Sequence, residues 1–237
     1  NQLLKCYDQI LCIINKENYI KYELLQIIED TRKVLDKGKE HGHELFLNFC
    51  EKNLTKLKDS SDQQQWIVEV GCSREIIEGQ NSTKSIIEFA QRFGYSFLGI
   101  DLDENNIKAL KRDFDHTNAK WIAGKGEEVL KELNYNISAI YLDAYDIVHP
   151  NHSFIRQLKY QEKYGNVINR DECYKMHLEA SINVVDKINA NGIIGIDDTW
   201  KEGEVWEGKG ALAIPWLENN GWKVSSTSKQ SVILVRN

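Results

Sequence analysis

A chain of 237 residues that is 41% hydrophobic and 28% charged can bury a full core, and this composition is ordinary for a soluble globular protein. Its net charge of −6, without any basic run that carries interleaved aromatic residues, excludes a nucleic acid as the expected main partner. No stretch approaches the roughly 20 apolar residues that span a bilayer, and five cysteines without a CxxC pair favour free thiols, so we expect a cytoplasmic protein that does not enter the membrane.

Residues 1–60 are predicted to form a helical extension that precedes the main domain. Apolar side chains recur at three- and four-residue spacing through 3–14, 24–35 and 45–54, and no alternating strand pattern occurs there. We interpret the extension as a cap over a sheet edge or as a dimerisation element, through which two copies would form a homodimer. A lid over a site is a third alternative. The main domain is expected to cover residues 61–237.

Strands and helices alternate through the main domain at the spacing of βαβ units. The apolar runs that we expect to be strands are 66–71, 96–101, 120–123, 137–143 and 193–197. The segments with helical periodicity are 82–93, 104–114, 126–133 and 171–189, the last of which ends in the stop signal Asn-Ala-Asn-Gly.

The part of the chain after the fifth strand predicts how the sheet ends. A glycine-rich loop at 202–210 contains Trp206, and we interpret it as a lid or as a surface loop whose tryptophan packs inward. A helix at 211–219 follows. Two terminal strands, 222–227 and 231–235, have only three residues between them, which is typical of a hairpin. Together the elements predict an α/β fold with a Rossmann-like, mostly parallel sheet of seven strands that ends in an antiparallel β-hairpin.

A glycine or an acidic residue closes strand after strand. These residues are Gly71 after the first strand, Asp101 after the second, Asp143 after the fourth and the pair Asp197 and Asp198 after the fifth. The carboxyl ends of parallel strands meet at one edge of an open sheet, and this edge is where such sheets bind ligands. We therefore expect one polar site at this edge.

In its first strand and in the order of its elements, the chain resembles the class I S-adenosylmethionine-dependent methyltransferases over residues 66–237. The run Val-Glu-Val-Gly at 68–71 is similar to the first motif of that family, where the chain turns away beneath the methionine part of the cofactor. The resemblance implies that Gly71 provides the φ freedom of this turn. It also implies that Ser82 and Thr83 cap the following helix, whose donor-rich N-terminus would face the cofactor's carboxylate. The family has several glycines just after the first one, which this chain lacks.

The resemblance also assigns residues beyond the first turn. An acid at the end of the second strand, here Asp101, would accept hydrogen bonds from the ribose hydroxyls. The alternative is a cap for the helix at 104–114, for which Asp103 is the competitor. Gly126 and Glu127 would lie by the adenine, unless Glu127 only stabilises a helix N-terminus. The cofactor residues implied in this way are Glu69, Gly71, Ser82, Thr83, Asp101, Gly126, Glu127 and Asp143.

The aspartates after the fourth and fifth strands form a second group of candidates. These strands are neighbours in a sheet of this order, so Asp143, Asp197 and Asp198 would lie close together, and a proton or a cation must relieve their repulsion. The pattern resembles metal-dependent O-methyltransferases of the catechol and macrocin types, which implies a divalent ion, Mg²⁺ or Mn²⁺, held by these carboxylates. The alternative is that Asp197 and Asp198 cap the next loop, while Asp143 hydrogen-bonds the cofactor amine.

The general base for methyl transfer is expected among the histidines. The catechol type has a lysine three residues after the strand-four aspartate, and this position is Asp146 here. We therefore choose His149 as the base, with His152 as the second candidate, and Asp143 completes the catalytic set. His177 is expected on a helix face that touches the site.

The sequence thus predicts an S-adenosylmethionine-dependent O-methyltransferase that uses a divalent cation and acts on a hydroxyl of a small polar acceptor, such as a sugar or a natural product. Three alternatives stay open. The first is a metal-independent N- or O-methyltransferase of the same fold. The second is a metallohydrolase or metal-binding module that uses Asp143, His149, His152 and Asp197. The third is an interaction protein that binds through its N-terminal helices.

Overall fold

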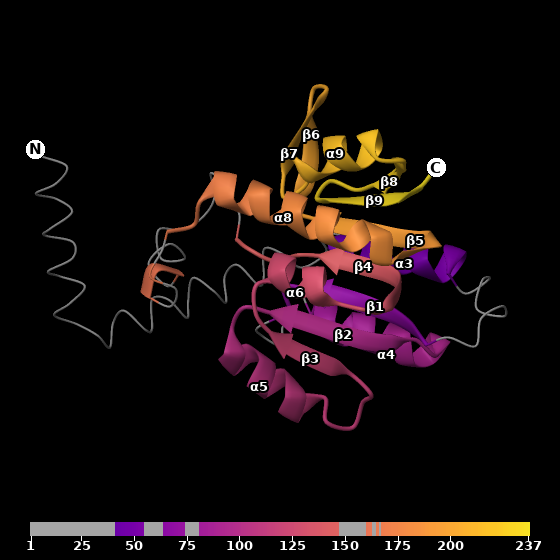
Figure 1. The fold of residues 1–237 in the computed structure, drawn as a ribbon, viewed down its shortest axis with the longest axis vertical. Helices are drawn as coiled ribbons and strands as arrows, with labels where there is room; N and C mark the ends of the chain where they lie inside the picture. Colours follow the sequence, from indigo (N-terminus) through magenta and orange to yellow (C-terminus); the bar gives the residue numbers. More distant parts are fainter. Residues whose placement is uncertain (1–40, 55–63, 74–80, 147–159, 163–164, 166) are drawn as a thin grey trace, which may run out of the picture. The chain divides into compact units, whose positions relative to one another are not determined.

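The computed structural model describes residues 41–54, 64–73, 81–146, 160–162, 165 and 167–237, and all elements named here lie within them (Figure 1). The strands of the main sheet are β1 (Gln65–Val70), β2 (Ser96–Asp101), β3 (Lys120–Ala123), β4 (Asn136–Leu142), β5 (Ile188–Asp197), β8 (Trp222–Thr227) and β9 (Ser231–Arg236). A separate hairpin consists of β6 (Thr199–Glu202) and β7 (Val205–Gly208). The helices are α3 (Gly42–Asn53), α4 (Ser82–Phe93), α5 (Glu104–Asp113), α6 (Gly126–Glu132), α8 (Arg170–Val184), the short 3-10 helix η2 (Val185–Lys187) and α9 (Ala213–Asn219). None of these helices combines the length and the apolar character that crossing a membrane requires.

The seven strands of the main sheet stand in the order β3-β2-β1-β4-β5-β9-β8 (Figure 1). The first five in this order are parallel, whereas β9 runs antiparallel to both β5 and β8. The winding reverses at β1, because this strand pairs with β2 on one side and with β4 on the other. The predicted α/β fold, with its mostly parallel sheet and its terminal hairpin, is confirmed.

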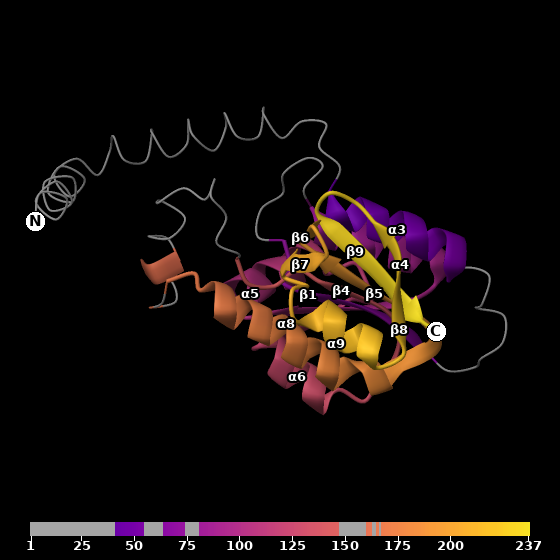
Figure 2. The same ribbon diagram turned by 90° about the horizontal axis from the view of Figure 1, so that it is seen from above.

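Helices cover both faces of the sheet, with α3 and α4 on one side and α6, α8 and α9 on the other (Figure 2). Strand β1 supplies side chains to both layers. Trp66, Val68 and Val70 belong to the hydrophobic cluster under α6, α8 and α9, whereas Ile67 belongs to the cluster under α3 and α4. Because both sides of a central parallel strand are buried, its sequence is a continuous apolar run. Glu69 interrupts this run and is nevertheless fully buried.

The end of α8 differs from the sequence prediction. The helix expected to reach residue 189 ends at Val184, and β5 begins at Ile188 after the turn of η2. The run Asn-Ala-Asn-Gly, predicted to stop that helix, belongs to the strand instead. There Asn189 Nδ2 donates to Ser138 Oγ on β4 at 3.1 Å. The run lies in a register shift between β4 and β5, because Ile188 pairs with Ile137 and the next paired residue, Ile193, pairs with Ala139.

The segment predicted as a glycine-rich loop at 202–210 is largely part of a β-hairpin. Strands β6 and β7 pair antiparallel, and Gly203, with a φ of +62°, begins the two-residue turn between them. Trp206 packs inward, where it is 9% exposed and joins the hydrophobic cluster under α6, α8 and α9. The inward-packed alternative is therefore the one observed for this tryptophan.

Helix α3 is the described part of the predicted N-terminal extension. It packs against β5, β9 and α4. The ring of Phe46 on α3 lies 5.1 Å from the ring of Tyr141 on β4, measured between centroids. Residues 1–40 and 55–60 of the predicted extension lie outside the described residues, so the division of the chain near residue 60 stays a prediction.

Candidate functional site

Gly71 ends β1 in a sharp turn. Its φ is +90°, a left-handed conformation that favours glycine. A Cβ atom at this position would overlap the backbone of Ala144 and would lie 2.6 Å from the carbonyl carbon of Asp143, because the chain after β4 passes directly against it. The Gly71 amide donates to Ile100 O on β2, and the Asp143 amide donates to Val70 O, both at 2.8 Å. Strands β1, β2 and β4 are thus joined at a turn that only glycine allows.

A hydrogen-bonded cluster of hydroxyl groups joins the loop after β1 to α4. Ser82 Oγ donates to Glu69 Oε1 at 2.6 Å and lies 3.0 Å from Ser73 Oγ. Ser73 N donates to Thr83 Oγ1 at 2.7 Å. The helix begins at Ser82, as predicted, but its capping residue is Asn81, whose side chain accepts from the first helical turn. The expectation that Ser82 and Thr83 cap this helix is therefore wrong, and their side chains instead hold the loop after β1.

Glu69 is fully buried beside these hydroxyl groups. Its Oε2 atom has no hydrogen-bond partner among the described residues. Burial raises the pKa of Glu69 to about 8, against the opposing effect of the hydrogen bonds from Ser82 and Thr83. The side chain is therefore mostly protonated at neutral pH, and a protonated carboxyl group can donate one hydrogen bond as well as accept others.

Asp101, at the end of β2, accepts two backbone hydrogen bonds. Its Oδ2 accepts from Cys72 N at 3.1 Å, and its Oδ1 accepts from Asp103 N at 2.7 Å. The cap of α5 is Asp103, whose Oδ1 accepts from Asn105 N at 3.0 Å. Asp101 is thus not the helix cap, and its carboxylate fastens the turn after β1 to the end of β2.

Gly126 and Glu127 begin α6, next to the end of β2. A Cβ on Gly126 would overlap Val70 Cγ1, so a glycine at this position allows α6 to approach β1 closely. Glu127 lies in the first turn of the helix, where burial raises its pKa and where an acidic side chain interacts favourably with the helix dipole. Gly124 N donates to Asp101 O at 2.9 Å, so the loop before α6 adjoins the end of β2 at Asp101.

The ammonium group of Lys209 lies between the carboxylates that follow β4 and β5. Its Nζ is 2.5 Å from Asp143 Oδ1, 3.2 Å from Asp143 O and 2.9 Å from Asp198 Oδ2. Burial opposes the charge of this lysine, but the neighbouring carboxylates raise the pKa of Lys209 well above its ordinary value. We call Asp143, Asp198 and Lys209 the strand-end cluster.

Asp197 does not join the strand-end cluster. A Cβ on Gly42, the first residue of α3, would overlap Asp197 Oδ1 and would lie 2.8 Å from its Cγ, so this carboxylate faces the start of α3. Burial, together with the charges of Asp143 and Asp198, raises the pKa of Asp197 well above its ordinary value. The described residues contain no group of three or more His, Cys, Asp or Glu side chains arranged to hold a metal ion. The predicted metal site of Asp143, Asp197 and Asp198 is therefore not supported, because Lys209 lies between two of the carboxylates and the third faces the start of α3.

Backbone geometry brings Lys209 to its partners. Within the described residues, Tyr145 and Asp198 are the non-glycine residues with a left-handed backbone, with φ of +62° and +42°. Such residues are uncommon, cost on the order of 1–3 kcal/mol each, and gather at functional sites. Lys209 N donates to Asp198 O at 3.0 Å, and a Cβ on Gly208 would overlap that oxygen. Sequence reasoning missed Lys209, although its place between Gly208 and Gly210 was a visible signal of a close approach.

His177 on α8 adjoins the strand-end cluster. It is fully buried, and its Nδ1 lies 2.8 Å from Cys173 O, so Nδ1 carries the proton and Nε2 is the acceptor. No partner for Nε2 is found among the described residues. Burial, and then the charge of Lys209, lowers the pKa of His177 to about 3, so the imidazole is neutral at neutral pH. The two histidines predicted as bases, His149 and His152, lie outside the described residues.

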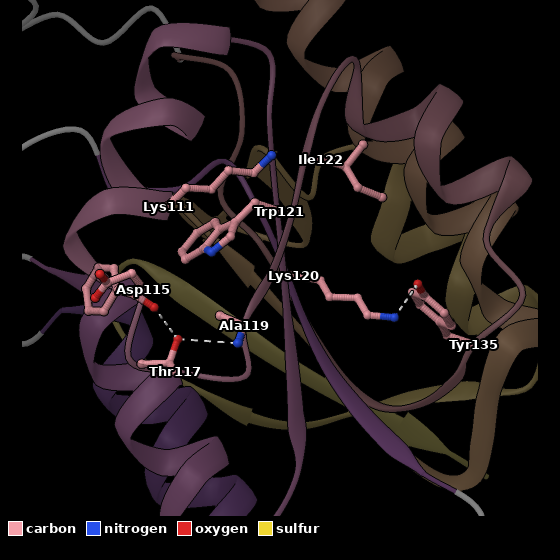
Figure 3. Close-up of a pocket in the computed structure, with 9 residues that line it drawn as sticks. Lys111, Asp115, Thr117, Ala119, Lys120, Trp121, Ile122 and Tyr135 are labelled. Atoms are coloured by element: carbon pink, nitrogen blue, oxygen red, sulfur yellow. Dashed lines mark hydrogen bonds between the residues drawn. The ribbon is translucent and has the colours of Figure 1, made fainter.

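A groove of about 380 Å³ lies at the β3 edge of the sheet, beside the end of α5 (Figure 3). Trp121, Lys120 and Tyr135 are among its lining residues. Lys120 Nζ lies 3.4 Å from Tyr135 OH and 4.8 Å from the ring centroid of Trp66. Because Lys120 begins β3 and Tyr135 precedes β4, the groove lies at the amino ends of these strands, at the opposite end from the strand-end cluster.

Known structures share this arrangement of strands, although no family model and no curated protein matches the sequence. The CMeT domain of the citrinin polyketide synthase has 12% identity and a TM-score of 0.50, over 81% of this chain and 51% of the other, so the present chain spans about half of that domain's length. A protein of Clostridium thermocellum assigned as an rRNA methylase has 10% identity and a TM-score of 0.51, over 84% and 99% of the two chains. A protein of Streptococcus mutans assigned as a methyltransferase, solved in complex with SAH, has 11% identity and a TM-score of 0.50, also over 84% and 99%.

The chain has the class I S-adenosylmethionine-dependent methyltransferase fold. Identities of 10–12% support an assignment of the fold but not of an activity, because many different activities share one fold. The broad resemblance predicted from the sequence is therefore confirmed at the level of the fold. The narrower likeness to the catechol and macrocin types has no support among these comparisons.

Proposed function

We propose that the protein transfers a methyl group from S-adenosylmethionine to a small polar acceptor. The observation that supports this most directly is the packing of the Gly71 turn against Ala144, which follows Asp143 of the strand-end cluster. A cofactor at the turn and an acceptor at the cluster would be neighbours, which an in-line displacement requires. The cofactor supplies an electrophilic methyl group on its sulfonium, and the residues of this chain bind and orient the two reactants.

The cofactor residues are proposed on the β1, β2 and α6 side of the sheet edge. Asp101 would accept hydrogen bonds from the ribose hydroxyls in addition to its two backbone bonds, because a carboxylate has about four lone-pair positions. The start of α4, which Ser82 and Thr83 tie to the loop after β1, would face the methionine carboxylate. Protonated Glu69, which precedes the Gly71 turn, would donate a hydrogen bond to the cofactor. The loop before α6, with Glu127, would lie by the adenine.

The acceptor is proposed to be a hydroxyl of a sugar or of a hydroxylated natural product. Asp143 and Asp198 would accept hydrogen bonds from it, since both carboxylates are partly exposed at the sheet edge. His149 is proposed as the general base, with His152 as the alternative.

Metal dependence divides the proposal into two forms. In the metal-dependent form, Asp143, Asp197 and Asp198 would hold Mg²⁺ or Mn²⁺, and Lys209 would have to leave its present position. The position of Lys209 favours the metal-independent form, because an ammonium group already offsets part of the negative charge of the carboxylate pair. Turnover in the presence of EDTA separates the two forms. Unchanged turnover supports the metal-independent form, and a loss of activity that Mg²⁺ restores supports the other.

Calorimetric titration with S-adenosylhomocysteine tests the proposed function itself. We expect saturable one-to-one binding, which replacement of Asp101 by alanine weakens. Transfer of a labelled methyl group to a panel of hydroxylated small molecules then tests catalysis. A chain that binds neither the cofactor nor its product is not a methyltransferase. In that case the metallohydrolase or metal-binding module and the interaction protein are the remaining alternatives.

A further inference from the structure

The ammonium group of Lys209 has its partners within the chain. Its Nζ donates to Asp143 Oδ1 at 2.5 Å and to Asp143 O at 3.2 Å, and it forms an ion pair with Asp198 Oδ2 at 2.9 Å. An ammonium group has three donors and no lone pair. The charge of Lys209 is therefore directed at the two carboxylates.

The side chains of the strand-end cluster differ in their exposure to solvent. Lys209 is 3% exposed, whereas Asp143 is 26% and Asp198 is 43% exposed. The cation thus lies behind two carboxylates that face the outside. A divalent ion bridging the same two carboxylates would need the position that Nζ takes, because both kinds of cation require close contact with oxygens of both groups.

The backbone around Lys209 is held at both ends, unlike that of a surface lysine. Lys209 N donates to Asp198 O at 3.0 Å, and Gly210 N donates to Thr199 Oγ1 at 2.9 Å. These bonds tie the end of β7 to the start of β6. The ammonium group therefore reaches its place from a segment whose position the hairpin determines.

We propose that Lys209 is the resident cation of the acceptor site, where it takes the position of a divalent ion and keeps Asp143 and Asp198 as oriented, anionic hydrogen-bond acceptors. Lys209 is a positioning residue, because it acts on a bound acceptor only through the two carboxylates. The nature of that acceptor rests on the proposed methyl transfer, whereas the role of the lysine as a cation does not. It follows that removal of the ammonium group creates a site for a divalent ion that the unaltered protein lacks.

Binding of Mn²⁺, followed by electron paramagnetic resonance, tests this proposal with the full chain. We expect no saturable binding to the unaltered protein. The Lys209→Ala variant should bind one Mn²⁺ at least about tenfold more tightly, a difference of about 1.4 kcal/mol. The double variant Lys209→Ala with Asp143→Asn should lose this gain. Lys201→Ala, which removes an exposed lysine from β6, is the matched control and should bind no Mn²⁺.

Two results overturn the proposal: tight Mn²⁺ binding by the unaltered protein, or no gain of binding in a folded Lys209 variant. Circular dichroism establishes folding first, and Lys209→Met serves where Lys209→Ala does not fold, because it retains most of the side-chain volume without the charge. The measurement on the unaltered protein is informative even if both variants unfold, since binding there contradicts the proposal and its absence supports it. A failure of S-adenosylhomocysteine to bind would overturn the proposed function and leave the Mn²⁺ result untouched.

Discussion

Lys209 Nζ lies 2.5 Å from Asp143 Oδ1, although 66 residues separate the two in the chain. The contact joins the end of β4 to the end of β7 and places a positive charge among the acidic residues that close the strands. Removal of one partner from a buried ion pair leaves an uncompensated charge, which typically costs about 3–5 kcal/mol. Lys209 thus supplies, from within the chain, a counter-charge to the carboxylates of this sheet edge.

The turn at Gly71 is expected to be intolerant of any side chain. Gly71→Ala should lose about 3 kcal/mol or more of unfolding free energy, because left-handed strain adds to the overlap with Ala144. It should also lose S-adenosylhomocysteine binding. Gly221→Ala is the control, since Gly221 has a φ of +83° with nothing within 4 Å of the position that a Cβ would take, and it should lose only about 1–2 kcal/mol. Equal losses in urea unfolding would show that the close approach of Ala144 is unimportant.

The carboxylate of Asp101 is expected to matter for the cofactor more than for stability. Asp101→Asn retains one acceptor oxygen but loses the charge, so affinity for S-adenosylhomocysteine should fall about 10- to 100-fold. Asp103→Ala removes the cap of α5 and should lose about 1 kcal/mol of unfolding free energy while binding the ligand normally. Calorimetry and urea unfolding on both variants separate the two effects. Normal binding by Asp101→Asn would remove Asp101 from the cofactor site.

Glu69 is expected to make the ligand-free protein less stable in alkaline solution. Its folded-state pKa of about 8 lies above the ordinary value of 4.5, so the folded state binds the proton more tightly than the unfolded state. The stabilising contribution is complete below pH 4.5 and is lost as the pH rises through 8. Glu69→Gln cannot ionise, so its unfolding free energy should rise relative to that of the unaltered protein by up to about 1.4 kcal/mol per pH unit in this window. Urea unfolding from pH 5 to 9 measures the difference, and parallel profiles would contradict the prediction.

His177 is expected to contribute to acid denaturation. Its folded-state pKa of about 3 lies below the ordinary value of 6.5, so the unfolded state takes up a proton first as the pH falls. Unfolding free energy should therefore decline between pH 6.5 and 3, with a slope of up to about 1.4 kcal/mol per pH unit from this group. His177→Gln should flatten that slope, whatever its effect on the stability at pH 7. His116→Gln, at an exposed position, controls for the loss of an imidazole.

The strand-end cluster predicts the charge of the acceptor. Two outward carboxylates with a buried ammonium group behind them favour hydroxyl or amine donors and repel phosphate and carboxylate groups. In a matched panel of a sugar, its amino derivative and its phosphate ester, we expect the phosphate ester to have the lowest kcat/KM, by a factor of about ten or more. A preference for the phosphate ester would contradict this charge assignment.

Much of the fold could be read from local patterns. The ranges of β2, β3 and α4 agree with the prediction residue for residue. Strand β2 is a short, fully buried apolar run, and α4 has helical apolar periodicity that stops at Gly94. Predictions failed where a distant partner decided the local structure. Asn189 lies in β5, where its side chain contacts Ser138 of β4, and the β6–β7 hairpin forms where glycines alone suggested a loop.

The sequence by itself determined the class of the fold and the sheet edge that collects the acidic residues, since both follow from apolar periodicity and from the order of elements. Only the tertiary structure decided which acids act together. Asp197 and Asp198 are adjacent in the chain, yet one faces the start of α3 and the other binds Lys209. The direction of a side chain at a strand end depends on its local φ and on the groups that pack against it. The glycines around Lys209 indicate a close approach, but neither its carboxylate partners nor the left-handed backbone of Asp198 can be read from a one-dimensional pattern.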